Sequence, residues 1–209
     1  MDEKELFDLF FSKQISAAKF IETYFTDISP SDEYILAKIT NAITNKDRIA
    51  IEESISILHS GQFTQAKLTE KLCEILAYPW HMEHEEIASM LQSLADPKTV
   101  DSLYQASKLQ FDYLDYDDTY QFARKCIKAM AQINDANAIN KLWLLADHDI
   151  VEISNYAKKE LRYKGLLLPE NPVADKTIAT QKKEGKRRLL ITIAVCVAVI
   201  FIAILYYLV

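Results

Sequence analysis

The chain has 209 residues, half of them hydrophobic, with 24 Lys and Arg against 30 Asp and Glu. Only three glycines and five prolines occur, which argues against β-sandwiches, Rossmann folds and P-loops because these folds need glycine-rich turns. The three cysteines are widely spaced and form no Cys-x-x-Cys motif, so a disulfide framework or a structural zinc site is not expected. The composition favours an all-α protein in a reducing compartment.

Hydrophobic residues recur at the spacing of one helix face along most of the chain. They predict helices over 2–12, 15–26, 30–44, 47–59, 65–77, 83–94, 97–108, 118–133, 136–146 and 150–163. Ser29-Pro30 is typical of a helix start, with Ser29 as the N-cap. Gly61 follows a helix where a left-handed C-cap would fall, and Gly165 is expected to stop the last one. We assign residues 1–62 to an N-terminal helical cap or small bundle.

An internal repeat organises the middle of the chain. The segment 87–103 aligns with the segment 126–142, and Asp96 falls on Asp135. Each unit therefore reads as a helix, a tight turn capped by aspartate, and a second helix. Such a helix pair cannot bury its apolar faces alone, so we expect neighbouring pairs to stack.

Three segments carry a family resemblance: MLQSLADPKTVDSLYQA at 90–106, AMAQINDANAINKLWLLA at 129–146 and DHDIVEISNYAKKEL at 147–161. They resemble the HEAT-like repeat family, including its shorter bacterial form. The resemblance implies an α-solenoid over residues 63–165 that serves as a protein-binding scaffold or adaptor; some bacterial members are lyase subunits or accessory factors. His84 and Ser154 stand where the family often has arginine, so an arginine–aspartate ladder between repeats is not expected.

The last 21 residues, 189–209, carry no charge, proline or glycine. A helix of this length is about 30 Å long and would cross a bilayer core, so we predict one C-terminal transmembrane helix. Residues 166–188 read as a linker that ends in a basic juxtamembrane segment. Within the predicted span, Ala194 and Ala198 form a small-xxx-small pair that favours self-association, although alanine is also common in spans.

Five basic residues set the expected topology: Lys182, Lys183, Lys186, Arg187 and Arg188. Positive residues beside a span stay in the cytoplasm, and these would also attract anionic lipid headgroups. We therefore expect a tail-anchored, single-pass membrane protein with its N-terminal domain in the cytoplasm and its C-terminus at the far face.

Residues 1–181 contain 19 Lys and Arg against 29 Asp and Glu. An acidic domain repels phosphate backbones, so nucleic acid is not an expected partner. A protein partner with a basic surface fits this charge better.

The aspartate–tyrosine segment, residues 110–120, is the first candidate site. Acidic and aromatic side chains together bind basic peptides through ion pairs and cation–π contacts. The candidate partner-binding residues are Asp112, Tyr113, Asp115, Tyr116, Asp117, Asp118 and Tyr120. The alternative is a solvated loop in which Asp117 caps the next helix and the tyrosines pack.

The segment Trp80–Glu86 offers a metal site as an alternative. His81 and His84 lie three positions apart, a spacing that presents two imidazoles to one cation. The zincin spacing of His-Glu-x-x-His is absent, and capping of the helix at 83–94 by His84 and Glu85 explains these residues better than a metal site does. We expect Trp143 and its leucine neighbours to belong to the core.

Together these patterns predict a membrane-tethered cytoplasmic scaffold, adaptor or regulator, such as a toxin-neutralising immunity factor. It would be non-catalytic and need no cofactor. The alternative is a metal-dependent enzyme that uses the His81 and His84 segment.

Overall fold

The computed structural model describes residues 2–61, 63, 65–114 and 119–167. This part of the chain contains ten α-helices, two short 3-10 helices and no strand, which confirms the all-α prediction. The helices are α1 (Glu3–Phe11), α2 (Ala17–Tyr24), α3 (Asp32–Asn45), α4 (Arg48–Ser60), α5 (Gln65–Ile75), α6 (His84–Leu94), η1 (Pro97–Thr99), α7 (Val100–Ala106), η2 (Asp112–Leu114), α8 (Gln121–Ile133), α9 (Ala136–Ala146) and α10 (Val151–Tyr163).

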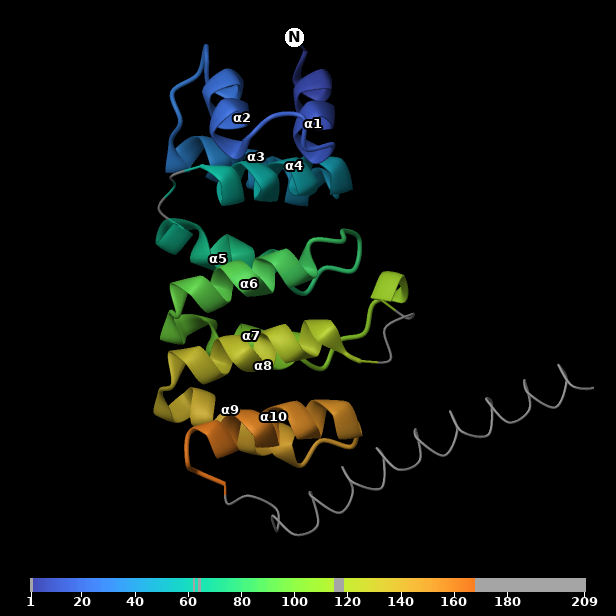
Figure 1. The fold of residues 1–209 in the computed structure, drawn as a ribbon, viewed down its shortest axis with the longest axis vertical. Coiled ribbons are helices and arrows are strands. Elements are labelled where there is room, and N and C mark those ends of the chain that lie inside the picture. The colour runs from blue at the N-terminus through green and yellow to red at the C-terminus, as the bar shows by residue number, and fades with distance from the viewer. Residues whose placement is uncertain (1, 62, 64, 115–118, 168–209) are drawn as a thin grey trace, which may run out of the picture. The chain divides into compact units, whose positions relative to one another are not determined.

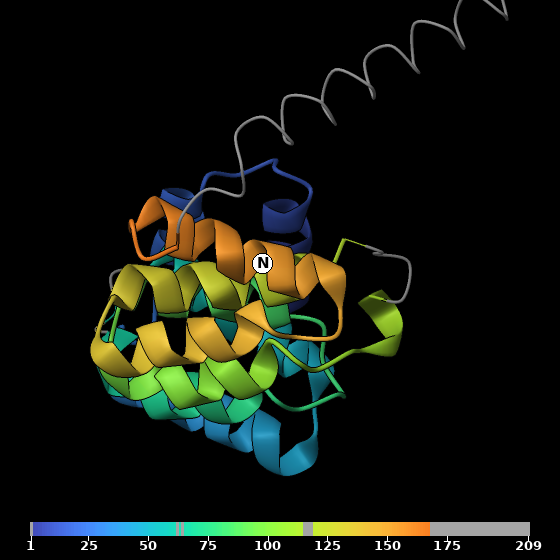
Figure 2. The same cartoon turned by 90° about the horizontal axis from the view of Figure 1, so that it is seen from below.

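The helices of the compact unit Met1–Leu166 stack in successive pairs (Figure 1). From α3 onward, each odd-numbered helix lies beside the even-numbered helix that follows it, and the pairs lie over one another when viewed along the stack (Figure 2). The even-numbered helices contact one another in succession, and so do the odd-numbered ones. Helices α1 and α2 pack together, and α2 contacts α4 at the start of the stack.

Contacts between successive pairs form the core. On α6, Ile87 and Leu91 are buried, and on the facing α8, Ile127 and Met130 are buried. Each such side chain contributes about 2 kcal/mol by leaving water. Because every inner pair has neighbours on both sides, its helices bury apolar residues toward both.

Three turns share one local geometry, in which a residue in the left-handed region precedes an N-cap aspartate: Lys46-Asp47, Ala95-Asp96 and Asn134-Asp135. The carboxylate accepts the N–H two or three residues on, at 2.9 Å from Lys98 and 2.7 Å from Ala138. The last two turns connect successive pairs: one joins α6 to η1 and α7, and the other joins α8 to α9. The aspartate turn therefore lies between the observed pairs, and not inside a pair as the repeat predicted. The recurring aspartates thus act as the predicted helix caps.

Two local predictions were wrong. The N-cap of α3 is Ser31, whose hydroxyl accepts the Tyr34 N–H at 3.1 Å, because Pro30 still belongs to the extended segment and the acids of the first turn follow Ser31. Gly61 is extended, with φ −98°, and not left-handed. A side chain at position 61 would collide with the ring of Phe63, which accounts for the glycine.

Trp143 is also not a core residue, since 40% of its surface is exposed. It lies on α9, in the last pair of the stack, where no further helix of the described chain covers it. The predicted span at 189–209 and the basic residues at 182–188 lie outside the described residues. In the part that the structure describes, no helix combines the length and the apolar character that crossing a bilayer requires.

Ala95 ends α6 at φ +49°, a conformation that costs an alanine about 1–2 kcal/mol. We expect Ala95→Gly to raise the free energy of unfolding by about 0.5–1 kcal/mol, the relief of strain exceeding the entropy that glycine adds to the unfolded chain. Chemical denaturation followed by circular dichroism measures this. Asn134→Ala, at the equivalent turn (φ +56°), should have the opposite effect; equal effects of both would contradict the explanation.

Candidate functional site

Two histidines stack at the start of α6. The rings of His81 and His84 are nearly parallel, with centroids 4.0 Å apart, and both side chains are buried. Phe111, from the connection between α7 and η2, stacks on His84 with a centroid distance of 3.7 Å. The histidine segment and the aspartate–tyrosine segment, which the sequence presents as separate candidates, therefore meet.

Backbone carbonyls fix the tautomer of both rings. Nε2 of His81 lies 2.7 Å from the Ile75 carbonyl oxygen, and Nε2 of His84 lies 2.8 Å from that of Tyr78. A carbonyl only accepts hydrogen bonds, so both Nε2 atoms carry the proton. These bonds tie the start of α6 to the chain that leaves α5.

The remaining ring nitrogens then act as acceptors. Nδ1 of His81 accepts the backbone N–H of Glu83 at 3.1 Å, and Nδ1 of His84 accepts the Tyr113 hydroxyl at 2.8 Å. All four nitrogens are thereby paired within the protein. The contact with Tyr113 also fixes η2 to α6.

The electrostatics agree with this assignment. Burial lowers the pKa of His81, and burial together with the neighbouring His81 lowers the pKa of His84 to about 3. Both rings are neutral at physiological pH. They serve as hydrogen-bonding, aromatic parts of the core.

This arrangement does not favour the metal site. A cation could reach His81 or His84 only by displacing a hydrogen bond from a lone pair that is already used. Among the described residues, no group of three or more His, Cys, Asp or Glu side chains is placed to hold a metal ion. His84 also does not cap α6, because the N-cap residue is Glu83 and no side chain makes the capping bond.

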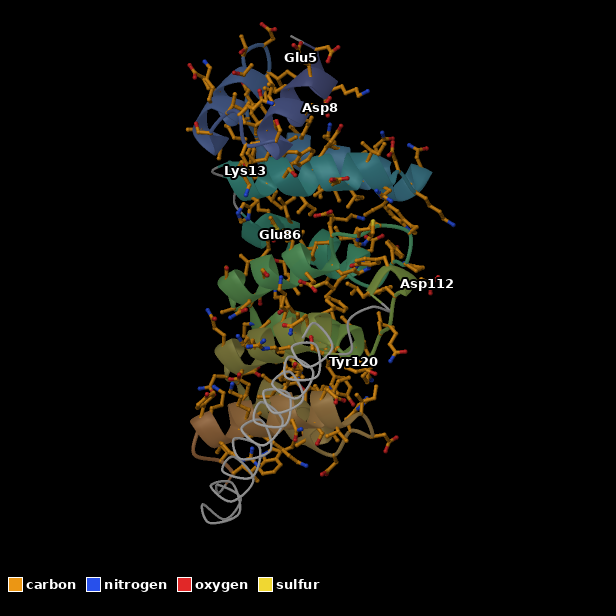
Figure 3. The ribbon with its side chains drawn as sticks, turned by 45° about the vertical axis from the view of Figure 1, so that its right-hand side comes forward. Glu5, Asp8, Lys13, Glu86, Asp112 and Tyr120 are labelled. Carbon is orange, nitrogen blue, oxygen red and sulfur yellow. The ribbon has the colours of Figure 1, made fainter. Side chains whose placement is uncertain are left out.

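The aspartate–tyrosine segment projects from the connection between α7 and α8. Within it, Phe111 is buried, Tyr113 is half-buried and Asp112 is exposed on η2. Figure 3 shows Asp112 and Tyr120 on the same side of the molecule. Tyr120 precedes α8 at φ +51°, a conformation that few non-glycine residues adopt. The other candidates, Asp115, Tyr116, Asp117 and Asp118, lie outside the described residues.

A groove of about 280 Å³ opens between this segment and the connection from α5 to α6. We call it the aromatic groove, and its lining is Arg48, Pro79, Trp80, His81, Met82, Gln110, Phe111, Asp112 and Tyr113. Met82 is 42% exposed, and Trp80 stacks against Tyr78. Sequence reasoning missed Arg48, Met82 and Gln110 as partners of this site; Arg48 comes from α4, and no local pattern connects it to the groove.

Carboxylates surround the start of α6. Burial, followed by repulsion from Glu52 and Glu86, raises the pKa of Glu83 to about 7, against a smaller opposing effect of Arg48. Glu86 also pairs with His59 of α4 at 2.9 Å. Several carboxyl groups therefore lie close together at the start of α6, and burial leaves that of Glu83 partly protonated near neutral pH.

The lining of the aromatic groove presents aromatic rings and one exposed carboxylate. Aromatic faces and the exposed Asp112 carboxylate provide cation–π and ion-pair contacts for a lysine or arginine. The described lining contains no serine or cysteine nucleophile, and the lone pairs of His81 and His84 are occupied.

Searches with protein-family models, curated proteins and solved structures found no significant match to this chain.

The buried charges predict how stability depends on pH. The pKa of His84 falls from 6.5 to about 3 on folding. The folded protein therefore loses stability as the pH falls below 6.5, because in that range only the unfolded state binds the proton. Glu83, with a pKa raised from 4.5 to about 7, binds its proton in the folded state first and so stabilises it over the same range. The two effects oppose each other between about pH 6.5 and 4.5.

We therefore expect Glu83→Gln to remove this compensation, so that stability falls more steeply between about pH 6.5 and 4.5 than it does in the wild type. The slope of the free energy of unfolding against pH should change by up to about 1.4 kcal/mol per pH unit. Denaturant unfolding at a series of pH values measures this slope. Glu152→Gln, at an exposed position of α10, is the matched control. A pH profile of Glu83→Gln that matches the wild type would contradict the assignment.

Proposed function

We propose that this protein is a membrane-tethered scaffold whose aromatic groove binds a basic segment of another cytoplasmic protein. The supporting observation is the groove itself, in which exposed Met82 and Asp112 lie beside Trp80 and Tyr113. Aromatic residues, methionine and a charged neighbour are the composition that dominates binding energy at interfaces.

The buried histidine pair supports this proposal because it makes one side of the groove rigid. His81 lines the groove, and His84 holds Tyr113 through the 2.8 Å hydrogen bond. A partner would therefore meet side chains that are already ordered, and binding would cost less conformational entropy.

Charge supports a basic partner. Residues 1–181 carry ten more acidic than basic side chains. The groove lining itself holds one charge of each sign, Asp112 and Arg48, so the preference for a basic partner rests on the charge of the surrounding chain. Complementary charge accelerates the encounter and rejects acidic competitors. The neighbouring Asp115, Asp117 and Asp118 add to this charge in the sequence.

The stacked pairs support a HEAT-like solenoid, the architecture that the sequence resembles. Position 154, where that family often has arginine, holds a buried serine whose hydroxyl donates to the Ala146 carbonyl at 2.6 Å. His84 makes a similar tie from α6 to the carbonyl of Tyr78, which follows the end of α5 at Ile75. Each side chain links an even-numbered helix to the chain just before it, where the family often has an arginine. Scaffolds, adaptors and immunity factors fit such a framework.

The membrane tether rests on residues 182–209, with five basic side chains before an uncharged stretch of 21 residues. A tether confines the groove to the membrane surface and raises the effective concentration for a partner that acts there.

The groove is tested by affinity capture with the full-length tagged chain from its native host. We expect Met82→Ala with Asp112→Asn to reduce recovery of the partner at least about tenfold, since two interface residues at about 1 kcal/mol each would be lost. Glu5→Gln with Asp8→Asn, on α1 (Figure 3), removes charge elsewhere and should have no effect. Equal recovery with both double variants would place the binding surface away from the groove.

The tether is tested by deletion of 189–209. We expect the truncated chain to leave the membrane fraction and to retain its affinity for the captured partner, because the groove lies entirely within α4–η2. Retention of the truncated chain in carbonate-washed membranes would contradict the proposed anchor.

A further inference from the structure

Large apolar side chains are exposed unusually often at the α9–α10 end of the stack. The described residues contain ten exposed large hydrophobic side chains, and five of these lie between residues 143 and 166. That segment is only about a seventh of the described chain. Trp143 is 40% exposed and Val151 is 63% exposed, at positions where a globular surface normally carries polar groups.

The contacts of α9 show which way Trp143 faces. Lys141 reaches back to α7, where its ammonium lies 2.9 Å from the Asp101 carboxylate and 4.7 Å from the centre of the Tyr104 ring. A residue two positions on in a helix points about 200° away. Trp143, together with Ile139 one turn before it, therefore lies on the side of α9 that is turned away from α7.

The contacts of α10 show which of its side chains face the same way as Trp143. Tyr156 reaches back toward α8, donating to the Thr119 carbonyl at 2.6 Å and lying under the Arg124 guanidinium. Val151 and Lys158 are about 220° and 200° from Tyr156 around the helix. They point away from α8, on the end of the stack that Trp143 also faces.

We define the end face as Ile139, Trp143, Val151 and Lys158. It combines the exposed side chains of Trp143 and Val151 with the half-buried side chains of Ile139 and Lys158. This is the combination that settles at the boundary between lipid headgroups and acyl chains.

The balance of charge also distinguishes the α9–α10 end from the rest of the stack. Residues 1–134 contain 13 Lys and Arg against 22 Asp and Glu, whereas residues 135–166 contain five of each. An anionic bilayer would repel the rest of the stack and accept this end. The described chain also leaves α10 here, through Gly165 at φ +69° and the exposed Leu166, toward the predicted juxtamembrane segment.

We propose that the end face is a membrane-contact surface that rests on an anionic bilayer, with Trp143 at the headgroup boundary. This inference depends on the proposed tether, which brings the end face to the membrane. Contact through this face would hold the stack upright on the bilayer and fix the height and direction of the aromatic groove.

Fluorescence of Trp143 tests the contact, because the chain contains only two tryptophans. In full-length protein carrying Trp80→Phe, reconstituted in phosphatidylglycerol–phosphatidylcholine vesicles, Trp143 is the sole emitter. We expect lipids brominated near the headgroup to quench most of its emission, and Val151→Asp with Lys158→Glu to abolish most of that quenching. The matched variant Trp143→Phe, which leaves Trp80, should show little quenching.

Vesicle flotation and the quenching of Trp143 together test the tether and the contact separately. Vesicle flotation first shows whether the chain is anchored; a chain that does not float refutes the tether itself. An anchored chain whose Trp143 is quenched by aqueous iodide but not by brominated lipid overturns the contact proposal. Protection of Trp143 from both quenchers also overturns it and indicates that residues 167–172 or a second copy cover the face; dilution of protein in the vesicles separates these two cases.

Discussion

The packing of α6 against α8 is the interaction on which both the stack and the aromatic groove depend. It joins the two inner pairs through Ile87, Leu91, Ile127 and Met130. At its N-terminal end, α8 also places Phe122 5.5 Å from the ring of His84 and 5.7 Å from that of Phe111. The same interface that buries apolar surface therefore sets the position of the groove lining. A change deep between these helices would alter the binding surface without touching it.

The helices were predictable because their causes are local. Amphipathic spacing and cap residues act within a few turns of chain, so the predicted helices at 136–146 and 83–94 differ by no more than one residue from α9 and α6. The alignment of Asp96 with Asp135 likewise indicated two equivalent turns, and both carboxylates cap helices. The predicted N-cap of α3 was wrong by two residues because Ser29 and Ser31 both have the chemistry of a cap, and only the backbone path decides between them.

The composition of the site was not predictable, because it arises from contacts that are distant in sequence. Arg48 and Asp112 line one groove although 64 positions separate them. The two histidines suggested a metal by their spacing, yet backbone carbonyls and Tyr113 use their nitrogens. Trp143 was placed in the core because its neighbours are leucines; its exposure follows from its position in the last described pair, which is a property of the assembled stack.

The burial of Cys126 has a practical consequence. Its side chain is inaccessible at the centre of α8, and burial raises the pKa of its thiol far above the ordinary value. Only a thiolate in contact with solvent reacts with alkylating reagents, so Cys126 will be labelled only when α8 separates from α6. The rate at which Cys126 is labelled therefore measures how often the middle of the stack opens. Partially exposed Cys73, on α5, provides a fast reference in the same molecule.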